Sequence, residues 1–242
     1  MSAVGLRGTV SVRDLAALLD VSEQTVRRVV RPMVERGDVR KVHGAIVGVT
    51  ATGEAPFLER MNVEREAKVR IAAAVASLVR DRDTVALDTG STTAFIAQAL
   101  RAHHGLTVVT NSSFVATTLA TVPGNRVHMA GVELRNHDGA SFDAQAFRVV
   151  RSMHVRVAVL SASAVDPLRG VMVHEQCEAE MSSAMGDIAD VRIVAADASK
   201  FGRSALVALP ALGADDLVVT DTRPSRVLER TLRPARVVVA PA

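Results

Sequence analysis

The sequence TVALDTGSTT occupies residues 84–93 and carries the clearest indication of the fold. Residues 84–87 predict a short buried strand, and a helix is predicted to begin after Ser91. Between them, a glycine and hydroxyl side chains stand where free amides and the helix dipole favour an anion. Because Ser and Thr are also ordinary helix caps, this loop alone leaves a purely structural role equally open.

Short apolar segments alternate with helical ones on both sides of this loop. Strands are predicted at 106–109, 126–130, 156–160, 191–195, 217–220 and 236–239, with helices after Asn111 and near 178–189. Such alternation predicts an α/β domain with a mostly parallel sheet covered on both faces.

Two further polar loops follow predicted strands: TNSS at 110–113 and DASKFG at 197–202. Ligands of open α/β sheets bind at the carboxyl ends of the strands, so the three loops are expected to share one edge. The second loop can hydrogen-bond a hydroxylated ligand or merely cap a helix. In the third loop, the simplest interpretation of Asp197 and Lys200 is a loop ion pair.

Composition excludes several classes of protein. With 48% hydrophobic residues, the 242-residue chain can bury the cores of two domains, one of them small. Aromatic residues make up only 2%, which argues against a stacking platform for single-stranded nucleic acid. The single Cys177 can form neither an internal disulfide nor a Cys-based zinc site, and it is interpreted as a small buried hydrophobe. No metal site and no cofactor are expected.

The N-terminus shows no signal peptide, because no charged segment is followed by a long apolar one. The longest apolar run, residues 71–79, falls short of the ~18 residues that span a bilayer. We therefore expect a soluble cytoplasmic protein with no membrane partner.

Residues 1–50 carry the whole net charge of +3, with eight Lys and Arg against five Asp and Glu. A small basic segment on a neutral body suits binding to the phosphate backbone of DNA. A solvated basic surface without a partner would show the same charge.

The basic segment also has the pattern of a winged helix-turn-helix. A helix at 12–19, a turn, Ser22 as N-cap and a helix from Glu23 to about Arg36 are predicted. Apolar residues expected between the two helices are Leu15, Ala16, Leu18 and Leu19 on the first and Val26, Val29 and Val30 on the second. Pro32 should kink the second helix beyond the turn that reads bases.

The second helix would lie in the major groove. Gln24 and Arg27 suit adenine or guanine edges, and Arg31 stands one turn further along for a phosphate. Residues 39–47 alternate around His43-Gly44 and predict a β-wing. His43 is interpreted as a wing-tip contact or an exposed turn residue rather than a metal ligand.

The predicted domains are 1–50 for the winged helix-turn-helix, 51–61 for the linker and 62–242 for the α/β domain. Asn62 is expected to cap a helix that runs to about Val79, and Lys68 is expected at a surface or interface.

Taken together, these motifs resemble the DeoR family of bacterial transcriptional regulators. The resemblance runs from Val10 to about Asp221 and includes TVRR (25–28), KVHG (41–44), FLER (57–60), DTGSTT (88–93), TNS (110–112), ADASKFG (196–202) and VVTD (218–221). It implies a ribose-5-phosphate-isomerase-like fold used as a sensor. The implied function is a repressor of sugar-metabolism genes that binds double-stranded operator DNA as a homodimer or homotetramer.

The pattern described above and the resemblance together give the expected site residues. The expected DNA-binding residues are Ser22, Gln24, Thr25, Arg27, Arg28, Arg31, Arg40, Lys41 and His43. Gly90, Ser91, Thr92 and Thr93 would hold the phosphate of a sugar phosphate. Asp88, Asn111, Ser112, Asp197 and Lys200 would meet the rest of this effector, and Glu178 would close the pocket.

The sequence departs from the family pattern at Val29, Pro32 and Ala45, and Ala130-Gly131 replaces a usual glycine pair. Residues 135–138 after that pair are expected to tune ligand choice or to form a solvated loop. Only residues 1–8 precede the first matching segment, so the first helix of the head is expected to be truncated, with a natural start upstream.

Two alternative functions remain open. One is an isomerase-like sugar-phosphate enzyme with Asp88, Asp197 or Glu178 as general base, against which the basic head argues. The other is a sensor whose truncated head no longer binds DNA.

Overall fold

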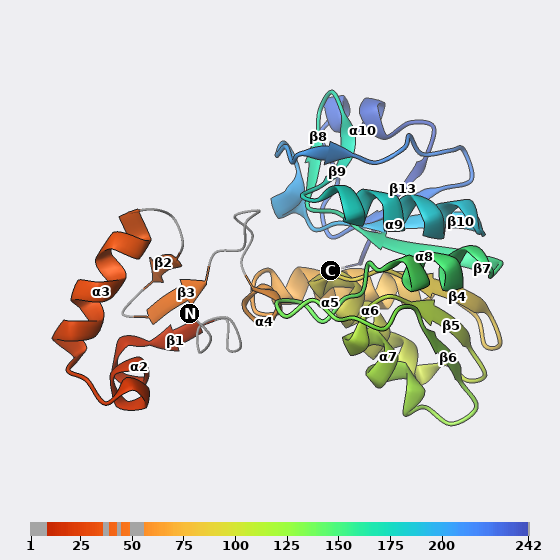
Figure 1. The fold of residues 1–242 in the computed structure, drawn as a ribbon. Coiled ribbons are helices and arrows are strands. Elements are labelled where there is room, and N and C mark those ends of the chain that lie inside the picture. Colours follow the sequence, from red (N-terminus) through yellow and green to blue (C-terminus); the bar gives the residue numbers. More distant parts are fainter. Residues whose placement is uncertain (1–8, 36–38, 43–44, 49–55, 242) are drawn as a thin grey trace. The chain divides into compact units, whose positions relative to one another are not determined.

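The computed structural model describes residues 9–35, 39–42, 45–48 and 56–241. The chain divides into two compact units (Figure 1). The first is Met1–Val63 with Asn136–Asp138, and the second is Glu64–Arg135 with Gly139–Ala242. Within the described residues, no helix is both long and apolar enough to cross a membrane.

The N-terminal unit is a winged helix-turn-helix, as the sequence predicts. Helices α2 (Val12–Leu19) and α3 (Glu23–Glu35) accompany an antiparallel sheet in the order β1-β3-β2 (Figure 1). The strands of this sheet are β1 (Thr9–Ser11), β2 (Val39–Val42) and β3 (Ala45–Gly48). The last two strands pair as the predicted wing, whose tip at His43-Gly44 lies outside the described residues.

Local capping places the turn between α2 and α3. Asp20 adopts a left-handed conformation with φ 51°, and its amide donates to the carbonyls of Ala16 and Ala17, which ends α2. The Ser22 hydroxyl then accepts from the Thr25 amide at 3.1 Å and so begins α3. The predicted N-cap is confirmed. Helix α3 also continues through Pro32 to Glu35, although that proline has no amide to donate.

The interface between α2 and α3 is narrower than the sequence pattern suggests. Val12, Leu15, Ala16, Val26 and Val30 form the core of this unit. Leu18, Leu19 and Val29 were expected there but are exposed by 54%, 56% and 57%, so this prediction was wrong. Val26 and Val30 are four residues apart on one face of α3, whereas Val29 is rotated away from it, and the two leucines lie in the last turn of α2.

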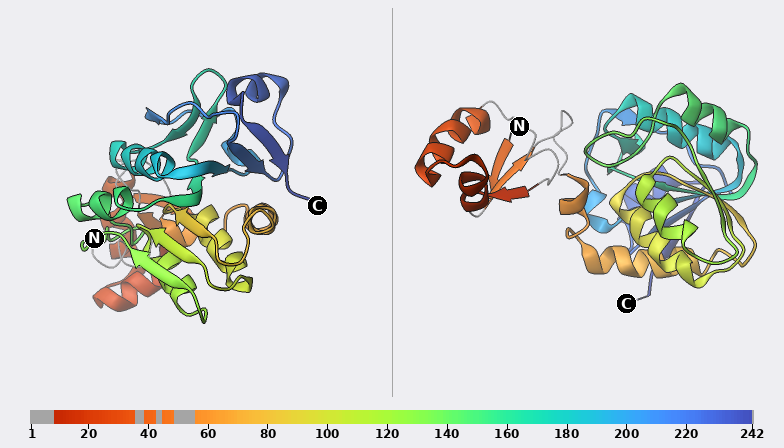
Figure 2. Two further views of the ribbon diagram at one scale, coloured as in Figure 1. Left: turned by 90° about the vertical axis from the view of Figure 1, so that its right-hand side faces the viewer. Right: turned by 60° about the horizontal axis from the view of Figure 1, so that its bottom comes forward.

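The second unit is built on a seven-stranded sheet in the order β13-β12-β10-β7-β4-β5-β6 (Figure 2). Every pairing in it is parallel, which confirms the predicted fold class. The strands are β4 (Thr84–Leu87), β5 (Thr107–Thr110), β6 (Arg126–Met129), β7 (Val155–Ser161), β10 (Ala189–Ala195), β12 (Leu217–Thr220) and β13 (Arg236–Val239).

The order of strands reverses between β4 and β7. Strands β5 and β6 extend the sheet on one side of β4, and β7, β10, β12 and β13 extend it on the other. In open α/β sheets the loops at such a reversal diverge and leave room for a ligand beyond the carboxyl ends of the strands.

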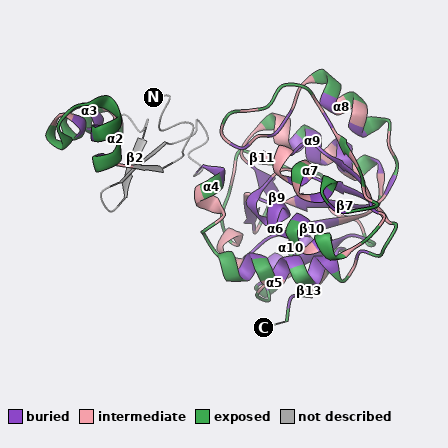
Figure 3. Ribbon diagram, turned by 90° about the horizontal axis from the view of Figure 1, so that it is seen from below, coloured by how far each residue is buried: buried purple, intermediate pink, exposed green. Residues whose placement is uncertain are grey.

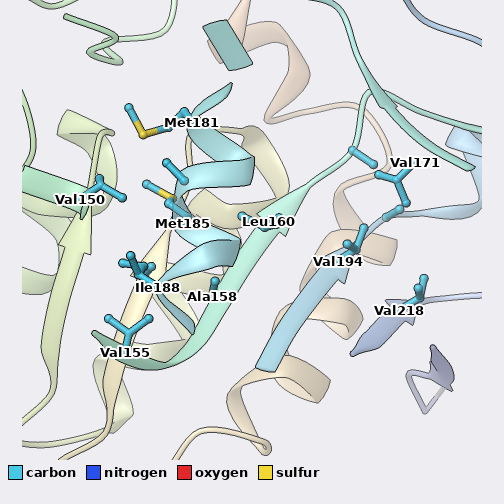
Figure 4. Close-up of a cluster of buried hydrophobic side chains, with 14 of the residues drawn as sticks. Val150, Val155, Ala158, Leu160, Val171, Met181, Met185, Ile188, Val194 and Val218 are labelled. Carbon is cyan, nitrogen blue, oxygen red and sulfur yellow. The ribbon is translucent and has the colours of Figure 1, made fainter. Parts of the chain in front are cut away.

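Helices cover both faces of the sheet. One face carries α8 (Ala144–Arg151), α9 (Gln176–Asp187) and α10 (Arg226–Leu232), whose side chains join Leu160 and Val194 in a buried cluster (Figure 4). Helices α5 (Arg65–Ala76), α6 (Ser91–Ala99) and α7 (Ser113–Ala120) pack in a row. Right-handed crossovers from β4 to β5 and from β5 to β6 place α6 and α7 on the opposite face, and α5 packs against α6 there. Figure 3 shows that the strands between the two layers of helices are the most buried part of this unit.

Several elements differ from the sequence predictions. Short elements were not predicted: α4 (Phe57–Arg60), η1 (Leu100–Ala102), η2 (Ala198–Lys200) and an antiparallel sheet of β8 (Ala164–Asp166), β9 (Gly170–Val173) and β11 (Val207–Ala208). Asn62 does not cap α5, because its side-chain Nδ2 donates to the Leu58 carbonyl and Glu64 is the residue that precedes the helix. Lys68 is buried rather than at the surface, since it lies on the inner side of α5.

Leu15→Ala should destabilise the N-terminal unit by about 2–4 kcal/mol, because it removes a buried side chain from a core of five residues. Leu18→Ala, in the same helix but half exposed, should change the stability by less than about 0.5 kcal/mol. Thermal and urea unfolding followed by circular dichroism measure both. Equal losses from the two substitutions would contradict the narrow interface described above.

Candidate functional site

Buried polar residues gather at the carboxyl ends of β4, β5 and β10. They are Asp88, Ser91, Thr92, Thr93, Thr110, Asn111, Ser112 and Asp197. The three loops that the sequence singled out therefore meet at one edge of the sheet, on both sides of the strand reversal. Burial of so many polar groups is costly unless each finds a partner.

Asp88 and Ser161 link the two strands at the reversal. The Ser161 amide donates to Asp88 Oδ2 at 2.7 Å, and the Ser161 hydroxyl lies 3.2 Å from the same oxygen. The hydroxyl also donates to the Thr89 carbonyl at 3.0 Å. Ser161 was not predicted, because it ends a strand far along the chain and carries no motif of its own.

Gly90 lies against this link. A Cβ at position 90 would stand 2.7 Å from Ser161 Oγ, closer than real Cβ atoms approach, and 3.0 Å from Ser161 Cβ. The glycine therefore permits the loop after β4 to touch the end of β7.

Helix α6 begins immediately after Gly90, so Ser91, Thr92 and Thr93 form its first turn. The first amides of a helix have no acceptor within the helix, and the dipole makes this end partly positive. The Thr93 hydroxyl donates to the Gly90 carbonyl at 3.0 Å and holds the turn. The predicted phosphate residues thus form a buried helix N-terminus.

The loop after β5 is fixed by the segment that follows residue 138. Asn111 Nδ2 donates to the Ser141 carbonyl at 3.1 Å, and the Ser141 amide donates to the Asn111 carbonyl at 2.8 Å. Ser112 caps α7 by accepting from the Val115 amide at 3.4 Å. The interpretation of this loop as a helix cap is therefore confirmed for Ser112. The side-chain oxygen of Asn111, by contrast, has no hydrogen-bond partner.

In the loop after β10, Asp197 Oδ1 accepts from the Ser199 amide at 3.0 Å. Among the described ion pairs there is none between Asp197 and Lys200, so the simplest interpretation of their spacing was wrong. Lys200 is partly exposed, and Asp197 is buried.

Four side-chain atoms in these loops are buried without a hydrogen-bond partner. They are Asp88 Oδ1, Thr89 Oγ1, Asn111 Oδ1 and Asp197 Oδ2. An unsatisfied buried polar group costs on the order of 1–3 kcal/mol. Four of them at one sheet edge, beside a helix N-terminus, form a polar site suited to a ligand that supplies donors and an anion.

Glu178 and Arg135 border this site. Glu178 lies in the first turn of α9 and accepts from the Glu175 amide at 3.2 Å, while Arg135 Nη2 donates to it at 3.3 Å. Arg135 also pairs with Glu175 at 2.9 Å and stacks over the Phe142 ring at 4.2 Å. Arg135 is therefore a structured connection between its loop and α9 rather than part of a solvated loop.

The environment changes the acidity of two groups here. Burial raises the pKa of Asp88 to about 7, opposed by the hydrogen bonds from Ser161 and supported by the nearby charge of Glu178. Burial likewise raises the pKa of the half-buried Cys177 thiol to about 11, so that it stays protonated. Of the Asp88 carboxyl and the Cys177 thiol, only the carboxyl changes its charge near neutral pH.

The predicted DNA-binding residues lie mostly on one helix. Gln24, Arg27, Arg28 and Arg31 are exposed on α3, and Arg27 pairs with Glu23 at 3.2 Å. Ser22 and Thr25 use their side chains in the cap, with hydroxyls 2.9 Å apart. Arg40 and Lys41 belong to β2, whose side chains are not described, and His43 lies outside the described residues.

Comparison with known proteins identifies both units. Residues 63–222 match the model of the DeoR C terminal sensor domain, and residues 2–52 match that of the DeoR-like helix-turn-helix domain. The chain belongs to the DeoR family.

This DeoR-family regulator is similar to two curated repressors of Escherichia coli K12. It is 29% identical to the glycerol-3-phosphate regulon repressor over 90% of this chain and 86% of the relative. It is 30% identical to the HTH-type transcriptional repressor CsqR over 96% of this chain and 88% of the relative.

Among solved structures, the DeoR-family chain is similar to ribose 5-phosphate isomerase A from two organisms. The protein of Methanocaldococcus jannaschii is 15% identical, with a TM-score of 0.42 over 57% of this chain and 55% of that one. The protein of Neisseria gonorrhoeae is 17% identical, with a TM-score of 0.41 over 57% and 54%. Likeness at this level carries no conclusion about chemistry.

Gly90→Ala should lower the stability of the sensor unit by about 1–3 kcal/mol, because the new methyl group overlaps Ser161. Gly213→Ala is the matched control, since its Cβ would meet Asp216 Oδ2 at an ordinary 3.4 Å. Thermal unfolding compares the two. A Gly90→Ala protein as stable as the control would contradict the close contact between β4 and β7.

Asp88→Asn should change how stability depends on pH. The pKa of Asp88 is about 7 in the folded protein and about 3.8 in the unfolded chain, so the folded state binds more protons between these values. Wild-type stability should therefore fall as the pH rises from about 4 to about 7, by up to about 1.4 kcal/mol per pH unit from this group. Urea unfolding at several pH values should show this slope reduced in Asp88→Asn; an unchanged slope would refute the assignment.

Proposed function

We propose that this DeoR-family protein is a DNA-binding transcriptional repressor whose sensor unit binds a phosphorylated sugar. The observation that carries the proposal is the set of unpartnered oxygens at the buried N-terminus of α6, in a chain that also carries a winged helix-turn-helix. The relatives are named as repressors, one of them of a glycerol-3-phosphate regulon, which supports the same function.

The DNA-binding part of the proposal rests on the exposed face of α3. Gln24 and Arg28 project from the first turns of the helix, where a recognition helix meets base edges. Arg31, together with the strand residues Arg40 and Lys41, would contact phosphates. The net charge of +3 on residues 1–50 favours this contact.

The effector part rests on complementarity. A phosphate would lie at the first turn of α6, where Gly90 to Thr93 present amides and hydroxyls. Sugar hydroxyls would donate to the unpartnered oxygens of Asp88, Asn111 and Asp197. Lys200 would add a positive charge, and Glu178 would border the pocket beside Arg135.

Such a repressor requires two states with different affinity for the effector. Helix-turn-helix proteins usually bind DNA as dimers with half-sites about one helical turn apart, and a homodimer or homotetramer is part of the proposal. The predicted domains 1–50 and 62–242 would then act as the DNA-binding head and the sensor, joined by the linker 51–61.

The test is fluorescence anisotropy of labelled DNA from upstream of the protein's own gene, at near-physiological salt. Tight binding to this duplex but not to a scrambled one, with release by one sugar phosphate, is the expected result. Equally weak binding to both duplexes would refute the proposed repressor function. Turnover of ribose 5-phosphate clearly above a blank would favour an enzyme instead.

Arg28→Ala should weaken binding to the native duplex by about 1–3 kcal/mol, roughly tenfold or more, because it removes a charged donor from the recognition helix. Arg226→Ala removes an exposed arginine from α10 of the sensor unit and should leave DNA affinity unchanged. Anisotropy titrations of the three proteins make the comparison. Equal losses in both variants would point to net charge rather than to α3.

A further inference from the structure

Asp221 is the last residue of the VVTD segment (218–221), which the proposed function does not use. It follows β12, the strand next to β10 in the sheet, and its side chain is only 10% exposed. Its Oδ1 accepts from the Ala198 amide at 2.8 Å, in the loop after β10. Asp221 therefore holds η2, the short turn that follows Asp197.

The other oxygen of Asp221 faces α5. Arg70 Nη2 lies 3.5 Å from Asp221 Oδ2, and the Thr222 hydroxyl donates to the same oxygen at 3.1 Å. Helix α5 also packs against β10 and β12. One carboxylate thus joins the loop after β10 to the first helix of the sensor unit, and the chain before that helix leads to the N-terminal unit.

The contact between Arg70 and Asp221 does not have its optimal geometry. Charge-assisted hydrogen bonds between a guanidinium and a carboxylate have N···O distances of about 2.7–2.9 Å, shorter than the 3.5 Å found here. In addition, Arg70 Nε is buried without a hydrogen-bond partner. A displacement of Asp221 by less than about 1 Å would therefore make or break a strong interaction with α5.

Asp197 provides the connection to the effector. Its Oδ1 accepts from the Ser199 amide within η2, whereas its Oδ2 is buried and unpartnered. A hydroxyl of the bound effector would draw this carboxylate toward itself, and η2 would follow because the Asp197 side chain is bonded to it. Since the Ala198 amide donates to Asp221, the position of Asp221 relative to Arg70 would change as well.

We propose that Asp221 is a positioning residue that transmits occupancy of the sensor site to α5 through its contact with Arg70. The inference rests on the proposed function and adds the route by which a bound effector changes the affinity for DNA. The alternative is an ion pair that only supports the structure. Because the Arg70 side chain is 35% exposed, such a pair would contribute little to stability, and its removal would leave regulation unaltered.

The test measures the coupling between effector and DNA in the full chain. Labelled native duplex is titrated with and without saturating ribose 5-phosphate, fructose 6-phosphate or glycerol 3-phosphate, and calorimetry measures the affinity for each compound without DNA. The coupling factor is the ratio of the DNA dissociation constants with and without the compound that releases DNA from the wild type. Such factors are typically about 5 to 150.

Two variants break the contact from opposite sides. Arg70→Met removes the charge of the arginine, and Asp221→Asn keeps an acceptor for the Ala198 amide while removing the charge that faces Arg70. Each should lower the coupling factor about threefold or more. The affinities for the compound alone and for DNA alone should stay within about twofold of the wild type. Arg70→Lys, which keeps the charge, should retain more of the coupling than Arg70→Met.

Arg223→Met is the matched control. Arg223 lies two residues beyond Asp221 but pairs with Glu229 at 2.8 Å, so its removal breaks an exposed ion pair of the same unit that does not involve α5. The control should keep the coupling factor of the wild type. The double variant of Arg70→Met and Asp221→Asn should lose no more coupling than either single variant, because both substitutions remove the same link.

Melting temperatures establish that the variants are folded, and the Arg70 variants decide alone if Asp221→Asn is not. Wild-type coupling in folded Arg70→Met, additive losses in the double variant, or an equal loss of affinity for the compound itself would overturn the inference and leave the proposed function intact. A wild-type chain that binds the native duplex specifically but responds to none of the compounds refutes the proposed regulation, and this inference with it.

Discussion

The sensor unit depends on the contact that joins β4 to β7 at the strand reversal. Asp88 accepts from the amide of Ser161, and Gly90 lets the loop approach so closely that a methyl group has no room. This contact fixes where α6 begins, and the beginning of α6 fixes the first turn formed by Ser91 to Thr93. The neighbouring loops after β5 and β10 can then bring their own polar groups to the same edge.

The energetic cost of leaving these polar atoms unpartnered supports the proposal that the edge is a ligand site. Natural interiors leave few polar atoms unpaired, and those that remain often mark ligand sites. Here the Asn111 amide, the Asp197 carboxylate and the Asp88 carboxylate each keep one oxygen free although their other polar groups are well bonded. One polar atom of each side chain thus maintains the local structure, and in the proposed function the other atom would meet the ligand.

Much of this fold was predictable because its determinants are local. The strand–loop–helix unit around Asp88 and the cap at Ser22 depend on residues close in sequence, and both agree with the structure. Ser161 was not identified, because it reaches the site from a distant segment and only the tertiary fold brings it there. Arg135 was named only within a loop expected to tune ligand choice or to be solvated, and its pairing with Glu178 depends on the tertiary fold in the same way. Periodicity likewise placed Leu18 and Val29 on apolar faces but could not show how narrow the contact between α2 and α3 is.

Because the pKa of Asp88 is raised, this side chain can change its protonation state near neutral pH. An anion seated at the start of α6 would raise this pKa further, because two neighbouring negative charges repel. Near neutral pH, part of the Asp88 population would then take up a proton as the anion arrives. The amount of anion held by the sensor unit would therefore follow the acidity of the surrounding solution, and the same total concentration of ligand would saturate the protein more fully on the acid side.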